Sequence, residues 1–231
     1  MIKQATINLK THKKYNLLFF ILLTIFFIIL YLSNALILSL ESLKIPPLIS
    51  APTPPFLKAF IQTYQKFYQA ILFGAFLSFY LFCLGRAYVR RKETEQALLS
   101  GRSPLNIALV NATESFIVFS YFIVIYLIVL LVFQPLFERL VIYSHSLMAQ
   151  TMAGVPTQLE KMIQSDVEEQ FVVRMTNTKQ IFEYLLYFSK EDWSRLFLTA
   201  YIRTIVGIAG CILPIHLLVP WIYATWKKKK S

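Results

Sequence analysis

The chain has 231 residues, of which 57% are hydrophobic and only 15% are charged, and its formal net charge is +11. A soluble domain of this size carries about a quarter charged residues, so the composition excludes an ordinary soluble globular protein. The basic residues lie at the ends of apolar segments, which argues against a nucleic-acid partner and is typical of membrane proteins.

Four apolar segments are long enough to cross a membrane. About 20 apolar residues span the hydrocarbon core of roughly 30 Å, and such segments must be helical because a lone strand leaves its backbone groups unpaired in lipid. The sequence therefore predicts an all-α integral membrane protein with four transmembrane helices, at 15–40, 67–89, 104–137 and 198–226. The first helix is too long for the apolar part of a signal peptide, and we expect it to be retained.

Lysine and arginine orient the predicted helices. They cluster before the first helix, between the second and third, and after the fourth, and cytoplasmic segments carry such an excess. We therefore expect both termini and the segment between the second and third helices in the cytoplasm, and the other two connections outside. The resulting segments are an N-terminal stretch at 1–14, an outer connection at 41–66, a cytoplasmic segment at 90–103, an outer connection at 138–197 and a basic tail at 227–231.

The connections differ in character. Residues 1–14 are amphipathic when drawn as a helix, which predicts an interfacial helix with lysines toward anionic lipid; the alternative is a disordered basic anchor. Within the connection 41–66, the proline-rich residues 46–55 are expected to be extended, and the helix-favouring run FLKAFIQTYQKFYQA that starts at Phe56 leads into the second span. Within 138–197, residues 155–164 read as a helix that starts at Thr157, and residues 177–188 as an amphipathic helix, so this outer loop is expected to form a small helical cap.

The residues needed for catalysis do not gather anywhere in the sequence. The three histidines lie in different regions, and no HExxH, GxSxG or Walker A pattern occurs. We expect no enzyme activity and no metal or cofactor bound by this chain. The polar residues within or beside the predicted spans are Glu114, Arg203 and His216. Glu114 either carries protons or makes a hydrogen bond that locks helices together, Arg203 snorkels to the interface, and His216 is either a relay residue or a packing residue.

The cytoplasmic segment RRKETEQALLSGRSP, which starts at Arg90, has the features of a short helix followed by a turn. Residues 93–99 favour a helix, Gly101 is a natural stop, and Pro104 suits the first turn of the next helix. One face of this helix is small and apolar, and such a strip suits a groove on a soluble partner. The strip consists of Thr94, Ala97, Leu98 and Gly101.

This spacing resembles the cytoplasmic loop of the FtsX-like permeases, the macrolide-exporter and cell-division superfamily of ABC transporters. The matching positions are Arg90, Arg91, Glu93, Gly101, Ile107 and Glu114, and the N-terminal Lys3, Ala5, Asn8, Leu9 and Lys10 resemble that family's entry helix. The resemblance implies a permease subunit in a bacterial cell membrane. It would pair with a second copy or a paralogue, and with two copies of a separate ABC ATPase that binds ATP and Mg²⁺.

The resemblance also implies a role for the cytoplasmic segment as a coupling helix that docks on the ATPase. The implied docking residues are Arg90, Arg91, Glu93, Thr94, Ala97, Leu98, Gly101 and Arg102. ATP hydrolysis would drive export of peptides or lipophilic compounds, defence against them, or mechanotransmission. Three features depart from the family. The connection 41–66 is short where the family has a large outer domain, and the connection 138–197 is unusually long, which makes it the candidate outer module instead. Position 97 is Ala where the family tends to have a larger aliphatic residue.

Two other functions fit the residues. A non-transport membrane protein, acting as an immunity or regulatory partner of another membrane complex, would use 90–103 only to fix its topology. A membrane enzyme would need a reactive group, for which Glu114 and His216 are the candidates. In every case the partners include membrane lipids and exclude nucleic acid.

Overall fold

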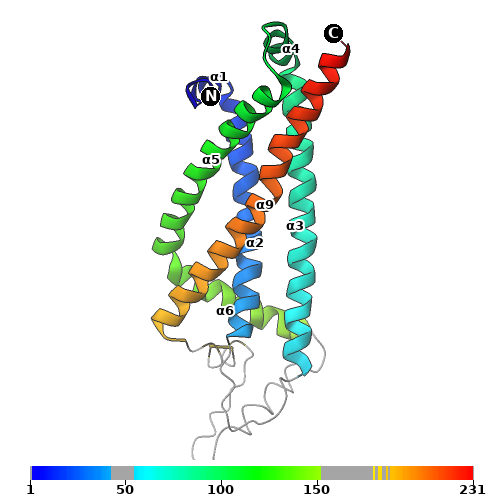
Figure 1. Ribbon diagram of the computed structural model, residues 1–231. Coiled ribbons are helices and arrows are strands. Elements are labelled where there is room, and N and C mark those ends of the chain that lie inside the picture. Colours follow the sequence, from blue (N-terminus) through cyan, green and yellow to red (C-terminus); the bar gives the residue numbers. More distant parts are fainter. Residues whose placement is uncertain are drawn as a thin grey trace, which may run out of the picture. The chain divides into compact units, whose positions relative to one another are not determined.

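The computed structural model describes residues 2–42, 55–151, 179, 182–183, 186 and 188–230, and within these residues all regular structure is α-helical (Figure 1). This confirms the predicted all-α class. The helices in chain order are α1 (Ile2–Thr11), α2 (Lys13–Glu41), α3 (Pro55–Val89), α4 (Arg91–Leu99), α5 (Pro104–Val132), α6 (Gln134–Thr151) and α9 (Lys190–Lys230).

Four of these helices are long and apolar enough to cross a membrane, which agrees with the predicted number. They are Lys13–Glu41, Lys58–Val89, Pro104–Val132 and Lys190–Lys229. Two start earlier than the hydropathy pattern indicates, because polar but helix-favouring residues extend α3 back to Pro55 and α9 back to Lys190. Ser189 begins α9 as an N-cap, since its hydroxyl oxygen accepts a hydrogen bond from the Asp192 backbone N–H at 3.1 Å.

The third predicted span, 104–137, is divided between two helices. α5 ends at Val132 and α6 begins at Gln134, because Pro135 has no N–H to continue the hydrogen-bond ladder of α5. α6 therefore occupies the start of the predicted outer connection 138–197. The proline-rich residues 46–54 and the predicted helix at 155–164 lie outside the described residues, and so does most of the predicted helix at 177–188.

Contacts within the chain define two compact units. Unit 1 comprises Met1–Leu30, Gln69–Val129 and Ile202–Ser231, and unit 2 comprises Tyr31–Tyr68 and Leu130–Tyr201. Unit 1 is held together by aromatic contacts between helices. The ring of Phe19 on α2 lies 6.0 Å from Phe79 and 5.5 Å from Phe82 on α3, and Phe27 on α2 lies 5.3 Å from Phe122 on α5. Such pairs add about 0.5–1.5 kcal/mol each beyond the burial of their area.

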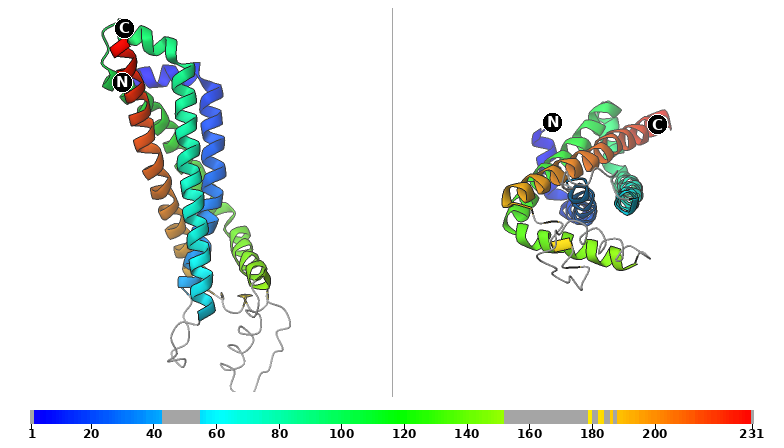
Figure 2. Two further views of the ribbon diagram at one scale, coloured as in Figure 1. Left: turned by 90° about the vertical axis from the view of Figure 1, so that its right-hand side faces the viewer. Right: turned by 90° about the horizontal axis from the view of Figure 1, so that it is seen from below.

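One end of unit 1 carries α1, α4 and the last turns of α9, and both termini lie there (Figures 1 and 2). Side chains connect these elements: Lys227 Nζ on α9 donates to Glu95 Oε1 on α4, and His12 Nε2, between α1 and α2, lies 3.0 Å from Glu93 Oε1. The hydrogen bond from Lys227 lowers the pKa of Glu95. The three basic segments predicted to share one side of the membrane thus meet at one end of this unit.

Candidate functional site

Unit 1 holds a fully buried carboxylate, that of Glu114 on α5. Two guanidinium groups pair with it: Arg86 Nη2 of α3 donates to Oε2, and Arg90 Nη1, from the turn between α3 and α4, donates to the same oxygen at 2.9 Å. Asn8 Nδ2 on α1 donates to Oε1. Three helices therefore meet on one side chain that is ten residues into a candidate membrane span.

The spacing of the polar residues explains why they face one another. Arg90 follows α3 directly and its backbone N–H still donates to the Arg86 carbonyl oxygen at 3.0 Å, so the two arginines share a face; Asn111 and Ser115 lie about one turn and one residue from Glu114 on α5. Arg90 Nη1 donates to Asn111 Oδ1 at 2.8 Å, and Arg86 Nη1 donates to Ser115 Oγ at 3.2 Å. These two hydrogen bonds flank the Glu114 carboxylate and connect its two arginine partners to neighbouring polar residues of α5.

These contacts make the burial of charge tolerable. An isolated ion in an apolar interior costs several kcal/mol, and it is tolerated where an opposite charge and hydrogen bonds replace its water. Arg90 also donates through Nε to Glu93 Oε2 at 2.9 Å, and Glu93 contacts His12. A continuous chain of polar contacts therefore runs from His12, between α1 and α2, through Glu93 of α4 and Arg90 to Glu114.

A serine–histidine contact extends the cluster to α9. The Ser115 hydroxyl is hydrogen-bonded to His216 Nδ1, and the imidazole packs 5.0 Å from the ring of Phe19. Ser115 Oγ also accepts from Arg86 Nη1 and donates to the Asn111 carbonyl oxygen at 3.3 Å. Within the described residues, Arg86 Nε and His216 Nε2 are the buried side-chain nitrogens with no hydrogen-bond partner. Both residues line a cavity of about 20 Å³, enough for one water molecule.

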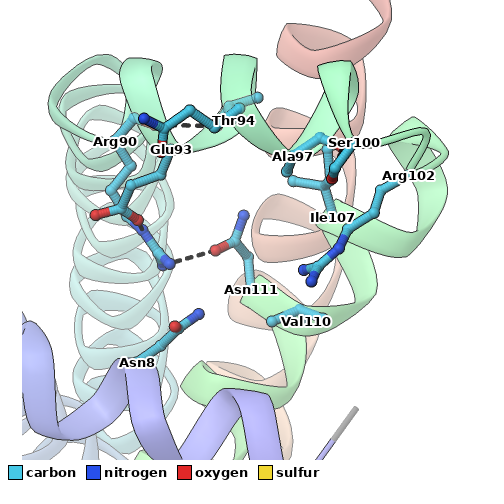
Figure 3. A pocket seen from close by; sticks show the side chains of 11 residues that line it. Asn8, Arg90, Glu93, Thr94, Ala97, Ser100, Arg102, Ile107, Val110 and Asn111 are labelled. Carbon is cyan, nitrogen blue, oxygen red and sulfur yellow. Dashed lines mark hydrogen bonds and ion pairs between the residues drawn. The ribbon is translucent and has the colours of Figure 1, made fainter.

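A second, larger cavity of about 330 Å³ lies between α1, α4 and the start of α5 (Figure 3). Its wall is mostly polar on the α4 side and includes Ile107 and Val110 on the α5 side. Arg90 and Asn111 line this cavity and also belong to the hydrogen-bonded network of Glu114. The cavity therefore borders the buried site. The lining residues are Asn8, Arg90, Glu93, Thr94, Gln96, Ala97, Ser100, Arg102, Ile107, Val110 and Asn111.

The orientation of α4 differs from the one expected for a docking strip. Thr94 is buried in the chain itself and its hydroxyl donates to the Arg90 carbonyl oxygen at 3.1 Å, while Ala97 lines the cavity of Figure 3. Leu98 is only partly exposed, whereas Leu99 is 79% exposed. The accessible apolar residue of α4 is therefore Leu99, which the sequence analysis did not select.

Other predicted site residues are exposed on the surface of the chain. Arg91 is exposed, with its guanidinium carbon 4.9 Å from the centre of the Tyr88 ring. Gly101 has φ +84°, a left-handed conformation that glycine adopts without strain, and it ends the turn after α4. Arg102 is exposed in the same turn, and Arg203 is exposed on α9.

Comparisons with protein-family models, curated proteins and solved structures found no match.

A buried histidine also lies in unit 2. His145 of α6 is hydrogen-bonded through Nε2 to Ser39 Oγ at 2.8 Å and through Nδ1 to Tyr64 OH at 3.2 Å, and it stacks on Phe182 with ring centres 5.4 Å apart. Burial lowers the pKa of His145 from 6.5 to about 3. The imidazole is therefore neutral at physiological pH, and it joins α2, α3 and α6.

Neither serine–histidine pair has the arrangement of a catalytic triad. In a triad the second ring nitrogen donates to a carboxylate that orients the histidine. Here the second nitrogen of His145 faces Tyr64, and that of His216 has no partner among the described residues. In the part of the chain that the structure describes, no group of three His, Cys, Asp or Glu residues is placed to hold a metal ion.

The structure brings some of the predicted residues together and separates others. Arg90, Glu93, Glu114 and His216 belong to one connected network, whereas Arg203 lies outside it. Arg86, Asn111 and Ser115 were not among the residues predicted from the sequence to form a site. Their spacing carried a usable signal, since polar residues at i, i+3 and i+4 in an apolar helix face one neighbour.

Proposed function

We propose that the chain is the permease subunit of an ABC transporter of the FtsX-like type, in a bacterial cell membrane. In this account a separate ATPase, in two copies, binds ATP and Mg²⁺ and docks on α4. A second permease copy or a paralogue completes the complex. The energy of ATP hydrolysis then drives export of peptides or lipophilic compounds, defence against them, or mechanotransmission across the membrane.

The observation that carries the proposal is the attachment of α4 to the rest of unit 1. α4 lies between two candidate spans, α3 and α5. It is also tied sideways, because Glu93 contacts Arg90 and His12 while Glu95 contacts Lys227 of α9. A displacement of α4 is therefore transmitted to the helices around it, which is what a coupling element must do.

The outer face of α4 supplies a surface for such a partner. Arg91, Lys92 and Leu99 are exposed, so this face combines two positive charges with one large apolar side chain. An apolar side chain in a partner's pocket with charges at the rim is a common form of protein interface. The residues most directly implied in docking are accordingly Leu99 and Arg91 rather than Thr94 and Ala97.

The proposal is tested by replacing Leu99 with Glu in the complex purified from native membranes in mild detergent. We expect the ATPase activity of the complex to fall at least about tenfold, since a buried interface anchor typically contributes 2 kcal/mol or more. The matched control is Leu147→Glu, the same change at an exposed leucine of α6. It should leave the activity within about twofold. Equal activity of the Leu99→Glu and Leu147→Glu complexes would contradict docking through α4.

One observation favours a second function. Thr94 is buried and Ala97 faces a cavity of its own chain, so the small apolar strip of α4 is already used internally. This suits a non-transport membrane protein, an immunity or regulatory partner of another complex, in which the segment 90–103 only fixes topology. On this account the Leu99→Glu change leaves the partner complex intact, and the partner that co-purifies is not an ATPase.

A further inference from the structure

The larger cavity of unit 1 combines an uncompensated cation with free hydrogen-bond donors. Of the charged residues that line it, Arg90 and Glu93 are paired with each other at 2.9 Å. Arg102 is the remaining one, and its guanidinium group forms no ion pair with any described residue. Its side chain runs back from the turn after α4 toward Val110 and Asn111 (Figure 3). The cavity therefore has a net positive charge.

The remaining polar groups of the wall complement an anion with several oxygens. Asn111 uses Oδ1 to accept from Arg90, which leaves its Nδ2 to donate, and the Gln96 amide also lines the cavity. Arg102 offers a planar guanidinium, which pairs with phosphate oxygens through two parallel N–H donors. The volume of about 330 Å³ is at the small end of ligand sites. It suits a phosphate headgroup rather than a larger ligand.

The position of the cavity selects the source of that phosphate. Arg102 stands two residues before Pro104, where a candidate membrane span begins, and α1 on the other side of the cavity leads into α2 at Lys13. Lys13 and Lys14 are exposed at the start of that helix. The cavity thus lies at the boundary between hydrocarbon and water, the level at which phospholipid headgroups lie.

We propose that this cavity, between α1, α4 and the start of α5, binds the phosphate of an anionic phospholipid, with Arg102 as its principal ligand and Asn111 and Gln96 as further donors. Such a lipid contacts both α4 and the wall of the Glu114 cluster. It would therefore stabilise α4 in its place. The site does not depend on the proposed ABC function, because it would form in any membrane protein with this arrangement.

The test uses the full chain in a neutral detergent free of phosphate, at about 0.15 M salt. Binding of short-chain phosphatidylglycerol, short-chain phosphatidylcholine and inorganic phosphate is measured by microscale thermophoresis. We expect phosphatidylglycerol to bind about tenfold more tightly than phosphatidylcholine. Arg102→Gln should weaken its binding about tenfold, which corresponds to the loss of one charge-assisted contact. Ala97→Leu, which fills the cavity without changing charge, should weaken it as well.

Arg91→Gln is the matched control, because it removes one positive charge from exposed α4 outside the cavity. At this salt concentration charges more than about 8 Å apart are screened, so binding should change by less than about twofold. Equal losses in Arg91→Gln and Arg102→Gln would show general attraction to a basic surface and overturn the site. Inorganic phosphate that competes as well as the lipid, or a short polyglutamate peptide that binds more tightly, would overturn the assignment to a phospholipid.

Discussion

At the scale of single residues, the carboxylate of Glu114 is the counter-ion that the buried guanidinium groups of Arg86 and Arg90 share, and Arg90 also pairs with Glu93. Glu114→Gln leaves both arginines without this negative charge, and breaking a buried ion pair in this way lowers the free energy of unfolding by about 3–5 kcal/mol. We expect a correspondingly lower unfolding temperature in detergent. A thiol-reactive fluorogenic dye reports it, because Cys83 and Cys211 are buried in the same unit and react only on unfolding.

The double variant Glu114→Gln with Arg86→Gln is the control for that experiment. It removes one charge of each sign and leaves Arg90 with Glu93, so it should be more stable than Glu114→Gln alone. If Arg86→Gln instead lowers the unfolding temperature of the Glu114→Gln variant further, Glu114 is not the counter-ion of Arg86.

His145 provides a second prediction at the residue scale, on the pH dependence of stability. Its pKa is about 3 in the folded chain and about 6.5 when unfolded, so below pH 6.5 the unfolded chain takes up a proton that the folded chain does not. The free energy of unfolding should therefore fall by about 1.4 kcal/mol for each pH unit between 6.5 and 3. Thermal unfolding followed by tryptophan fluorescence measures this, with Trp193 buried in the same unit.

The comparison variant for this pH series is His145→Gln, which keeps a hydrogen-bonding side chain but does not titrate. The difference in stability between the two proteins should shrink steadily as the pH falls from 6.5 toward 4. A constant difference over that range would mean that His145 is not held neutral by the fold.

At the scale of elements, the turn after α4 depends on the backbone of Gly101. Its φ of +84° is strained for any residue with a Cβ, although a Cβ there would meet no atom within 4 Å. Gly101→Ala should therefore cost about 1 kcal/mol through backbone conformation alone. Gly74→Ala in α3 is the control, because Gly74 also has open space and lies inside a regular helix, where Ala is favoured. Comparable losses in the two variants, measured by thermal unfolding, would contradict the role of the turn.

The sequence predicted the number and type of the long helices because hydropathy over about 20 residues is a strong, local signal. It placed their ends less well. The third span was read through to 137, although Pro135 marks the break between α5 and α6. Hydropathy placed the start of the fourth span at residue 198 and missed the start of α9 at Lys190, because the first turns of α9 are charged.

Local sequence patterns could not predict which side chains of different helices pair with one another. Glu114 stands out in the sequence as a charged residue within a predicted span, but its partners depend on how α3 and the turn after it pack against α5. The rotation of α4 about its axis is set by the contacts of Glu93 and Glu95, which cross between helices. The expected docking strip on Thr94 and Ala97 therefore turned inward, and Leu99 outward.

At the scale of the whole molecule, the proposed orientation puts α4 in the cytoplasm and the start of α9 outside. Ser100→Cys and Lys190→Cys introduce one exposed thiol at each of these places, while the native cysteines are buried. In intact cells a membrane-impermeant maleimide should label Lys190→Cys and should label Ser100→Cys only after permeabilisation. The opposite pattern would reverse the topology, and labelling of both from outside would remove the basis for a cytoplasmic α4.

The central claim, a permease driven by an ATPase that docks on α4, is tested most directly by the composition of the native complex. The full chain, tagged and purified from its own membranes in mild detergent, should carry a P-loop ATPase at two copies for each pair of permease subunits. Quantitative mass spectrometry measures that ratio, and the Leu99→Glu chain should lose the ATPase while it stays in the membrane. A stable complex with some other membrane protein and no ATPase would contradict the claim.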